Sequence, residues 1–303
     1  MFTTDGSILE GTGRGAGGAG APALVLSVVI PMYNESARIG DTLRDVVKTL
    51  DAWGVASEVI TVDDGSTDGC GELVRSIADE LADGGSGAAR GVRVLTQARN
   101  RGKGAAVRRG LRESRGAWVL MMDADNSARL GELSKLAAAA SRSRVGLAVG
   151  SRNHPDSVVK ADPKRKLSGA VFRLVLGALG LSFVRDTQCG FKLYRRDTAD
   201  LCARRAVEDG FAFDLEHIGL AERSGLGVVE VGIAWVHRDG GSISVVRDGL
   251  KMIGQARRIR TRLHGIEARS AIGTDAPASV LELKPLTGAR ETEHEQAIES
   301  GAA

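Results

Sequence analysis

The sequence predicts an α/β fold: a mostly parallel sheet flanked by helices. Two observations support this class. Short apolar runs alternate with segments whose apolar residues recur at helical spacing between Leu24 and Val149, and polar residues directly follow several of the runs. A strand–helix alternation of this kind gives parallel strands with helices on both faces. The 303 residues are twice the ~150 of a common domain, which allows one large domain or two small ones.

The expected strands are short and apolar throughout, as for strands that are buried on both faces. They are Leu24–Ile30, which ends at Pro31, then Glu58–Val62, Val92–Leu95, Trp118–Met122 and Gly146–Val149. The expected helices have apolar residues three or four positions apart. They cover Ile39–Leu50, Leu73–Leu81, Ala105–Glu113 and Leu130–Ala140.

The two ends of the chain differ in composition from its middle. Residues 11–20 are almost all Gly and Ala, and Gly13, Gly15 and Gly18 form a GxGxxG there. A dinucleotide-binding fingerprint follows a strand, whereas this one precedes the first strand. The residues after 267 lack a sustained apolar period. We therefore expect a flexible Gly-rich arm at 1–22, a single domain at 23–266 and an acidic, disordered tail at 267–303.

The net charge of +3 is unevenly distributed. Residues 270–303 hold six acids and two bases, a net of −4, so residues 1–269 carry +7. A basic body suggests an anionic partner such as a nucleotide, a phospholipid surface or a nucleic acid. Aromatic residues make up only 4%, which leaves few platforms on which bases could stack. We therefore expect no nucleic-acid partner.

The sequence shows no segment that would span a membrane. Its longest apolar stretches, Leu24–Ile30 and Leu174–Val184, are shorter than the ~20 residues of a spanning helix. No basic segment precedes an apolar core at the N-terminus, as a signal peptide requires. The three cysteines form no CxxC pair, which argues against a disulfide framework or a zinc finger. We expect a cytoplasmic protein, or one attached peripherally to the cytoplasmic face of a membrane.

Polar clusters stand where three of the expected strands end. They are Tyr33-Asn34-Glu35, Asp63-Asp64 and Asp123-Ala124-Asp125. Ligands of open α/β sheets bind outside the carboxyl ends of the strands, so these distant clusters should converge. Each cluster alone also fits a helix cap or a turn, but a cap needs one carboxylate and these sites supply pairs.

The clusters suggest a site for a nucleotide diphosphate and a metal. The carboxylates of Asp123 and Asp125 suit Mg²⁺ or Mn²⁺, which proteins usually hold with one or two carboxylates plus substrate phosphates. Asp63 and Asp64 could accept hydrogen bonds from a base or a ribose. Lys103 lies between two glycines at a helix start, where free N–H groups would favour a diphosphate. It also fits an ordinary surface lysine.

Four motifs in this order resemble the family-2 glycosyltransferases. They are SVVIPMYNE at Ser27–Glu35, DDGSTD at Asp63–Asp68, NRGKGAA at Asn100–Ala106 and DADN at Asp123–Asn126. Further segments are similar to the dolichyl-phosphate β-glucosyltransferases. They are Gly150–Arg152, Val158–Lys160, DTQCGFK at Asp186–Lys192, Phe213–Glu216, and Trp235 with Gly241-Ser242. The resemblance extends from Leu24 to Arg262.

The resemblance implies a Rossmann-like nucleotide-binding domain of glycosyltransferase A type. Such an enzyme would transfer a sugar, most simply glucose from UDP-glucose, to a polyprenyl or dolichyl phosphate with inversion and a divalent metal. The carried-over nucleotide-sugar residues are Pro31, Tyr33, Glu35, Asp63, Asp64, Lys103, Asp123 and Ala124, with Asp123 and Asp125 as metal ligands. The chain departs from the family in having no N-terminal membrane helix and in having Ile243 where the family has lysine.

The acceptor side should be basic. A phosphate monoester is largely ionised at pH 7, so it needs positive charge more than a general base. Arginine suits bidentate phosphate contacts, which favours Arg152 and Arg165, although both also fit ordinary surface charges. Asp186 and Gln188 open the DTQCGFK loop and could contact the sugar or, for Asp186, act as a base or form a turn. We expect Asp125, Arg152 and Asp186 to be catalytic.

The lipid side leaves alternatives open. The stretch Arg247–Arg262 is rich in arginine with apolar residues at near-helical spacing, which fits either a basic helix in an anionic membrane interface or a solvated surface helix. Leu167–Val184 fits an interfacial helix or a segment packed on the core. For function, the alternatives are a GDP-mannose donor, a soluble acceptor, or a nucleotide-sugar sensor without turnover.

Overall fold

The computed structural model describes residues 24–83, 89–160, 176–177, 179–181, 183–238, 245–265, 281 and 283. The expected arm at 1–22 and most of the expected tail lie outside these residues. So do Arg165, most of the first half of Leu167–Val184, and Ile243. Within the described part, no helix combines the length and the apolar character that crossing a membrane requires.

The predicted α/β fold is confirmed. The strands are β1 (Leu26–Met32), β2 (Ser57–Asp63), β3 (Ala89–Thr96), β4 (Trp118–Met122), β5 (Leu147–Ser151), β6 (Val158–Lys160), β7 (Phe191–Arg195), β8 (Val228–Gly232) and β9 (Ala234–Val236). The helices are α1 (Ile39–Trp53), α2 (Cys70–Asp83), α3 (Lys103–Glu113), the 3-10 turn η1 (Leu130–Glu132), α4 (Leu133–Ser143), α6 (Arg196–Arg205), α7 (Phe213–Arg223) and α8 (Val245–His264).

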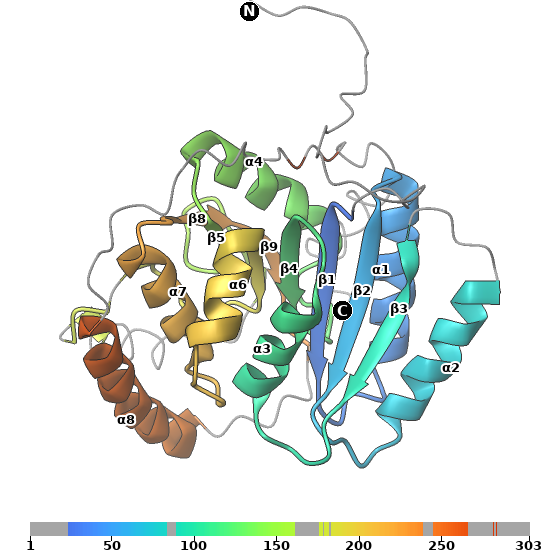
Figure 1. Ribbon diagram of the computed structural model, residues 1–303, viewed down its shortest axis with the longest axis horizontal. Helices are drawn as coiled ribbons and strands as arrows, with labels where there is room; N and C mark the ends of the chain where they lie inside the picture. The colour runs from blue at the N-terminus through green and yellow to red at the C-terminus, as the bar shows by residue number, and fades with distance from the viewer. Residues whose placement is uncertain are drawn as a thin grey trace, which may run out of the picture.

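Seven strands form the main sheet in the order β3-β2-β1-β4-β7-β5-β8 (Figure 1). The pairs β1–β2, β2–β3, β1–β4 and β5–β8 are parallel, whereas β7 is antiparallel to both of its neighbours. Strand β7 is not among the strands predicted from the sequence. Because β7 runs opposite to β4, Phe191 pairs with Met122, and the loop before β7 meets the carboxyl end of β4.

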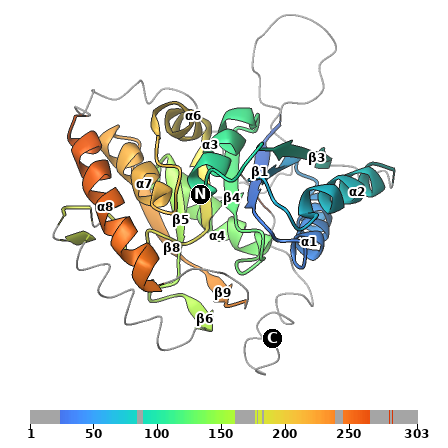
Figure 2. The ribbon, with the colours of Figure 1, turned by 90° about the horizontal axis from the view of Figure 1, so that it is seen from below.

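The helices form two layers, one on each face of the sheet (Figure 2). Apolar residues of α1, α2 and α4 pack on one face, and those of α3, α6, α7 and α8 pack on the other. Successive residues of β1 serve the two layers in turn, since Val28 belongs to the first cluster and Val29 to the second. The inner strands β1, β2, β4 and β5 are therefore buried on both faces.

Most strand and helix boundaries differ from the prediction by a few residues, and the end of β1 is one example. Strand β1 continues past Pro31 to Met32. Strand β4 pairs with β1 only as far as Val29, and proline is tolerated where one side of a strand is unpaired. At the other end, Leu281 is buried in the core and Leu283 packs against it. The chain thus returns to the core at two positions of the expected tail, while the domain boundary at residue 266 stays a prediction.

Candidate active site

The loops after β1 and β2 are joined by hydrogen bonds. The amide of Asn34 donates to Ser66 Oγ at 3.0 Å, and the amide of Thr67 donates to Asn34 Oδ1 at 2.9 Å. The amide of Ser36 donates to Asp68 Oδ2 at 2.8 Å. Tyr33 is 45% exposed at this edge, so its ring is available to a ligand. Pro31, two residues earlier, is buried within β1.

Asp63 and Asp64, which we expected to bind uridine, are buried and accept hydrogen bonds from the protein. Asp63 Oδ1 accepts from the Ser66 amide at 2.9 Å. Asp64 Oδ1 accepts from Gln97 Nε2 at 2.6 Å and from the Arg101 amide at 2.9 Å, and Oδ2 accepts from the Gly102 amide at 2.7 Å. Both oxygens of Asp64 are therefore engaged in holding the start of α3. Uridine contact stays a prediction for both Asp63 and Asp64.

The glycines around Lys103 allow a close contact within the protein, while a close approach of their backbone to a ligand stays a prediction. A Cβ on Gly102 would lie 2.4 Å from the carbonyl oxygen of Asp209, and one on Gly104 would lie 2.3 Å from that of Glu208. The Ala105 amide also donates to the Asp209 carbonyl, at 3.2 Å. These glycines let another loop pack closely. Lys103 can still offer its positive charge to an anion such as a diphosphate, and this contact stays a prediction.

Asp123 lies at the end of β4 and is seated by the chain before β7. Its amide donates to the Gly190 carbonyl at 3.1 Å, and a Cβ on Gly190 would lie 2.0–2.3 Å from the atoms of its carboxylate. Asp125 Oδ1 accepts from the Ser127 amide at 2.9 Å. Ala124 between them was expected near the nucleotide sugar, but its side chain is buried in the core and its carbonyl accepts from Thr42 Oγ1 at 2.8 Å. Contact of Ala124 with the nucleotide sugar stays a prediction.

Two ion pairs, one partly exposed and one buried, follow Asp123 toward the interior. Lys103 Nζ lies 2.5 Å from Asp123 Oδ1, with the two side chains 23% and 31% exposed. Deeper in the protein, Lys192 Nζ lies 2.6 Å from Asp214 Oδ1, and both side chains are buried. Burial raises the pKa of Asp214, whereas the charges of Lys192 and Lys103 oppose that rise. The four groups therefore share one electrostatic environment.

Lys192 and Asp214 were not predicted as individual site residues from the sequence. A signal for Lys192 was available, because it is the one charged residue before Arg195 in the strand FKLYR. Asp214 lies in the first turn of α7 and gave no comparable signal.

Glu35 lies near both aspartates of the DxD. It forms an ion pair with Arg38, whose Nε donates to Glu35 Oε2 at 2.8 Å. Burial raises the pKa of Glu35, and the charges of Asp125 and Asp123 add to the rise against the effect of Arg38. The structure thus brings together Glu35, Lys103, Asp123 and Asp125, as expected from the position of their motifs.

Arg152 and Asp186, which we expected to act separately, are partners. Arg152 Nε donates to Asp186 Oδ2 at 2.7 Å and Nη2 donates to Oδ1 at 2.9 Å, while the Arg152 amide also donates to Oδ2 at 2.9 Å. The guanidinium lies 5.4 Å from the ring centroid of Trp235, within cation–π range. Burial alone would raise the pKa of Asp186, but Arg152 outweighs it and holds this pKa below its usual range. Asp186 is poorly suited to be a general base.

The remaining residues of the DTQCGFK loop have structural contacts. The amide of Gln188 donates to Asp186 Oδ1 at 3.2 Å. Cys189 is buried, and burial raises the pKa of its thiol to about 12, which agrees with an apolar packing role. Contact of Gln188 with a sugar or an acceptor stays a prediction.

Asp123 and Asp125 fit a divalent cation that also takes ligands from its substrate. Among the residues that the structure describes, no three His, Cys, Asp or Glu side chains gather as a complete metal cage. Two carboxylates at a strand end, next to a lysine, match the way Mg²⁺ or Mn²⁺ is held together with substrate phosphates. The donor set suits these hard cations and does not suit a structural zinc.

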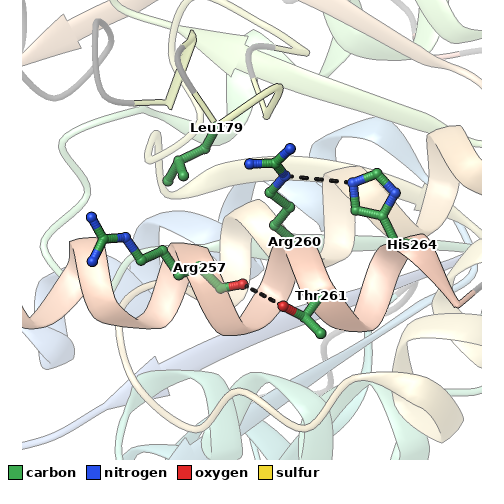
Figure 3. A pocket seen from close by; sticks show the side chains of 5 residues that line it. All are labelled: Leu179, Arg257, Arg260, Thr261 and His264. Atoms are coloured by element: carbon green, nitrogen blue, oxygen red, sulfur yellow. Dashed lines mark hydrogen bonds between the residues drawn. The ribbon is translucent and has the colours of Figure 1, made fainter.

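Helix α8 confirms the predicted helical pattern and has an exposed basic side. Its apolar residues Ile259 and Leu263 are buried, and Figure 2 shows α8 on the outside of α7. Its other side borders a pocket of about 450 Å³, lined by Leu179, Arg257, Arg260, Thr261 and His264 (Figure 3). Within the described part of the chain, Arg257, Arg258 and Arg260 form no ion pair with an acid, whereas Arg262 reaches Glu208 and Glu216.

The family follows from comparison with known sequences. A sequence model described as glycosyl transferase family 2 matches residues 27–201, which is more than half of the chain. The chain belongs to glycosyl transferase family 2. It is therefore a glycosyltransferase, and the resemblance drawn from its motifs is confirmed.

Curated relatives extend this match over most of the chain. The dolichyl-phosphate beta-glucosyltransferase of Dictyostelium discoideum is 32% identical over 250 residues, which cover 79% of this chain and 75% of the relative. That of Saccharomyces cerevisiae is 32% identical and covers 76% and 72%. The human enzyme of the same name is 31% identical and covers 74% and 71%.

Solved structures support the fold. Glucosyl-3-phosphoglycerate synthase of Mycobacterium tuberculosis has a TM-score of 0.56 at 22% identity, covering 80% of this chain and 81% of that one. Its complex with Mn²⁺, UDP-glucose and phosphoglyceric acid has a TM-score of 0.58 at 22% identity and covers 80% of each chain. At this identity the likeness concerns the fold alone.

Proposed function

We propose that this glycosyltransferase transfers glucose from UDP-glucose to the phosphate of a dolichyl or other polyprenyl phosphate, with inversion. The observation that supports this most is the meeting of the DxD end of β4 with the DTQCGFK loop before β7, through Asp123 and Gly190. It joins the motif expected to bind the donor to the motif shared with the dolichyl-phosphate β-glucosyltransferases. The named relatives, at 31–32% identity, support the same assignment.

The reaction is a single displacement. An oxygen of the acceptor phosphate attacks C1 of glucose, the bond from C1 to the β-phosphate oxygen breaks, and UDP leaves with the electron pair. The acceptor oxygen is already ionised at pH 7, so no side chain has to remove a proton. Attack from the side opposite to UDP inverts C1.

The chain's residues have separate tasks in this reaction. Asp123 and Asp125 would hold Mg²⁺ or Mn²⁺, which supplies positive charge to the departing diphosphate. Lys103 supplies a further charge for the same group. Tyr33 offers an exposed ring on which uracil can stack. Arg152, held in place by Asp186, attracts the acceptor phosphate. Arg165 keeps its proposed contact with the same phosphate.

The assignment is tested with a panel of donors and acceptors. UDP-glucose, other UDP-sugars and GDP-mannose are each combined with Mg²⁺ or Mn²⁺, with polyprenyl phosphate, with phosphoglyceric acid, or with no acceptor. We expect glycolipid product from UDP-glucose, a cation and polyprenyl phosphate. If only GDP-mannose gives product, the donor is GDP-mannose and not UDP-glucose. If only phosphoglyceric acid accepts the sugar, the acceptor is not a polyprenyl phosphate. Nucleotide-sugar binding without turnover in every arm would support a sensor.

We also propose that the exposed side of α8 contacts an anionic membrane, where a lipid acceptor resides. Arg257 and Arg260 extend from α8 on the side where Leu179 lies, which combines positive charge with an apolar contact (Figure 3). Each basic residue near an anionic surface contributes about 1 kcal/mol to binding.

The membrane proposal is tested by co-sedimentation with vesicles that contain anionic lipid. Replacing both Arg257 and Arg260 with Glu should weaken binding by at least tenfold. The matched control replaces the exposed Arg204 and Arg205 of α6 with Glu, which changes the net charge equally. Equal losses in the two variants would mean that net charge, rather than the side of α8, determines binding.

A further inference from the structure

Lys103 contacts the carboxylate of Asp123, which we propose as a ligand of the divalent cation. Its Nζ lies 2.5 Å from Oδ1 of Asp123. The Asp123 carboxylate lies directly over Gly190, where even a Cβ would overlap it, and the Asp123 amide is bound to the Gly190 carbonyl. The chain therefore fixes Asp123 on that side. A cation that binds Oδ1 of Asp123 would therefore have to displace the ammonium of Lys103.

The backbone of Lys103 is fixed, whereas its side chain has a flexible four-carbon stem. Asp64 holds the amides of Arg101 and Gly102, directly before α3 begins. A lysine side chain is ordinarily charged at neutral pH, and the carboxylate of Asp123 lies 2.5 Å from Lys103 Nζ. Lys103 thus stays charged, and it stays near the site when its side chain leaves Asp123.

We propose that Lys103 and the divalent cation compete for Asp123, so that the cation binds tightly only when a nucleotide diphosphate is present to take up Lys103. The inference rests on the proposed function, because it uses that function's cation and donor. Without nucleotide, the cation must break the Lys103–Asp123 pair and then lies beside a positive charge. With a diphosphate present, Lys103 gains a new anionic partner, and the repulsion is relieved. By linkage, the cation must tighten nucleotide binding by the same factor.

The test measures Mn²⁺ binding to the full chain by electron paramagnetic resonance of the free ion, without nucleotide and with saturating UDP. The wild type should bind Mn²⁺ weakly alone and more tightly with UDP, by a factor within the usual coupling range of about 5–150. Lys103→Met should bind Mn²⁺ alone about tenfold more tightly than the wild type, and its gain from UDP should shrink. The control, Lys48→Met, changes an exposed lysine of α1 and should match the wild type.

The outcomes separate this inference from the function on which it rests. If Lys103→Met binds Mn²⁺ alone no more tightly than the wild type, the competition is refuted even where the wild type forms glycolipid. If the wild type binds no Mn²⁺ even with UDP, the metal-dependent function fails and the inference fails with it. Lys103→Arg keeps the charge and should keep the weak binding of Mn²⁺ alone. Tight binding by that variant refutes the competition too, which provides a second readout if the Met variant does not fold.

Discussion

Two pairs of a cation and a carboxylate lie at the carboxyl edge of the sheet, Lys103 with Asp123 on the donor side and Arg152 with Asp186 on the acceptor side. The first is a single contact between partly exposed groups. The second has two side-chain bonds and one backbone bond to a carboxylate that is 4% exposed, and Trp235 lies against the guanidinium. A lysine is a point charge that can change partners, whereas a planar guanidinium in a forked contact stays oriented. We infer that Lys103 exchanges its partner Asp123 for a ligand during the reaction. The Arg152–Asp186 pair keeps its geometry throughout.

The largest effect should come from the donor side. Asp125→Ala removes a carboxylate that takes no part in either pair, so both pairs remain. We expect transfer to fall by about 10³-fold or more, because charge stabilisation of the leaving group is lost. The measurement is glycolipid formation, with circular dichroism to verify folding. Asp79→Ala, on the exposed side of α2, is the control. Full activity of Asp125→Ala would refute the assignment of the DxD.

Exchanging arginine for lysine at residue 152, and lysine for arginine at residue 103, tests whether the two ion pairs differ in this way. Arg152→Lys keeps the charge but loses the fork, so we expect kcat/KM for the acceptor to fall about 10²-fold through misplacement, with the donor KM unchanged. Lys103→Arg makes the opposite exchange at a single contact and should cost less than about tenfold. Equal losses in the two variants would mean that the two pairs do not differ as we infer.

The acceptor pair should also contribute to stability. Asp186→Asn leaves Arg152 without its charged partner, and we expect a loss of about 2–4 kcal/mol in the free energy of unfolding, below the range for a fully buried pair because Arg152 is one-third exposed. The folded state lowers the pKa of Asp186 from 3.8, so its contribution is complete above that pH and is lost as pH falls through the lower value. Urea unfolding from pH 7 to pH 3 should show the wild type and the variant converging at the acidic end. A constant difference across that range would contradict the ion-pair account.

The smallest effect should come from the ring beside Arg152. Trp235→Leu keeps an apolar side chain but removes the cation–π contact, which is worth about 0.5–2 kcal/mol. We expect a severalfold rise in the acceptor KM with kcat nearly unchanged, because the fork to Asp186 persists. Steady-state kinetics with varied polyprenyl phosphate provide the test. A loss as large as that of Arg152→Lys would assign Trp235 a direct role with the substrate.

The sequence predicted the local features of the fold better than the long-range ones. Strands β1 to β4 and the helices between them follow from apolar periodicity, which is set by neighbouring residues. Strand β7 was missed because FKLYR includes two charged residues, Lys192 and Arg195, and pairs with strands distant in the sequence. The site shows the same limit. The contacts of Asp64 with the amides before α3 could not be foreseen, because an acceptor for backbone amides and an acceptor for a ligand look alike in a sequence.

The antiparallel insertion of β7 also sets the order in which the site can be assembled during synthesis. Asp123 is translated long before Gly190, the residue that seats it, and β5 cannot join the sheet until β7 has arrived. Contacts between distant segments form slowly, since a long loop must close before they are gained. A nascent chain that ends before β7 would expose the open edge of β4, which is prone to aggregation. The proposed active site is thus completed late, because an unfinished chain lacks the contact with Gly190 that seats Asp123.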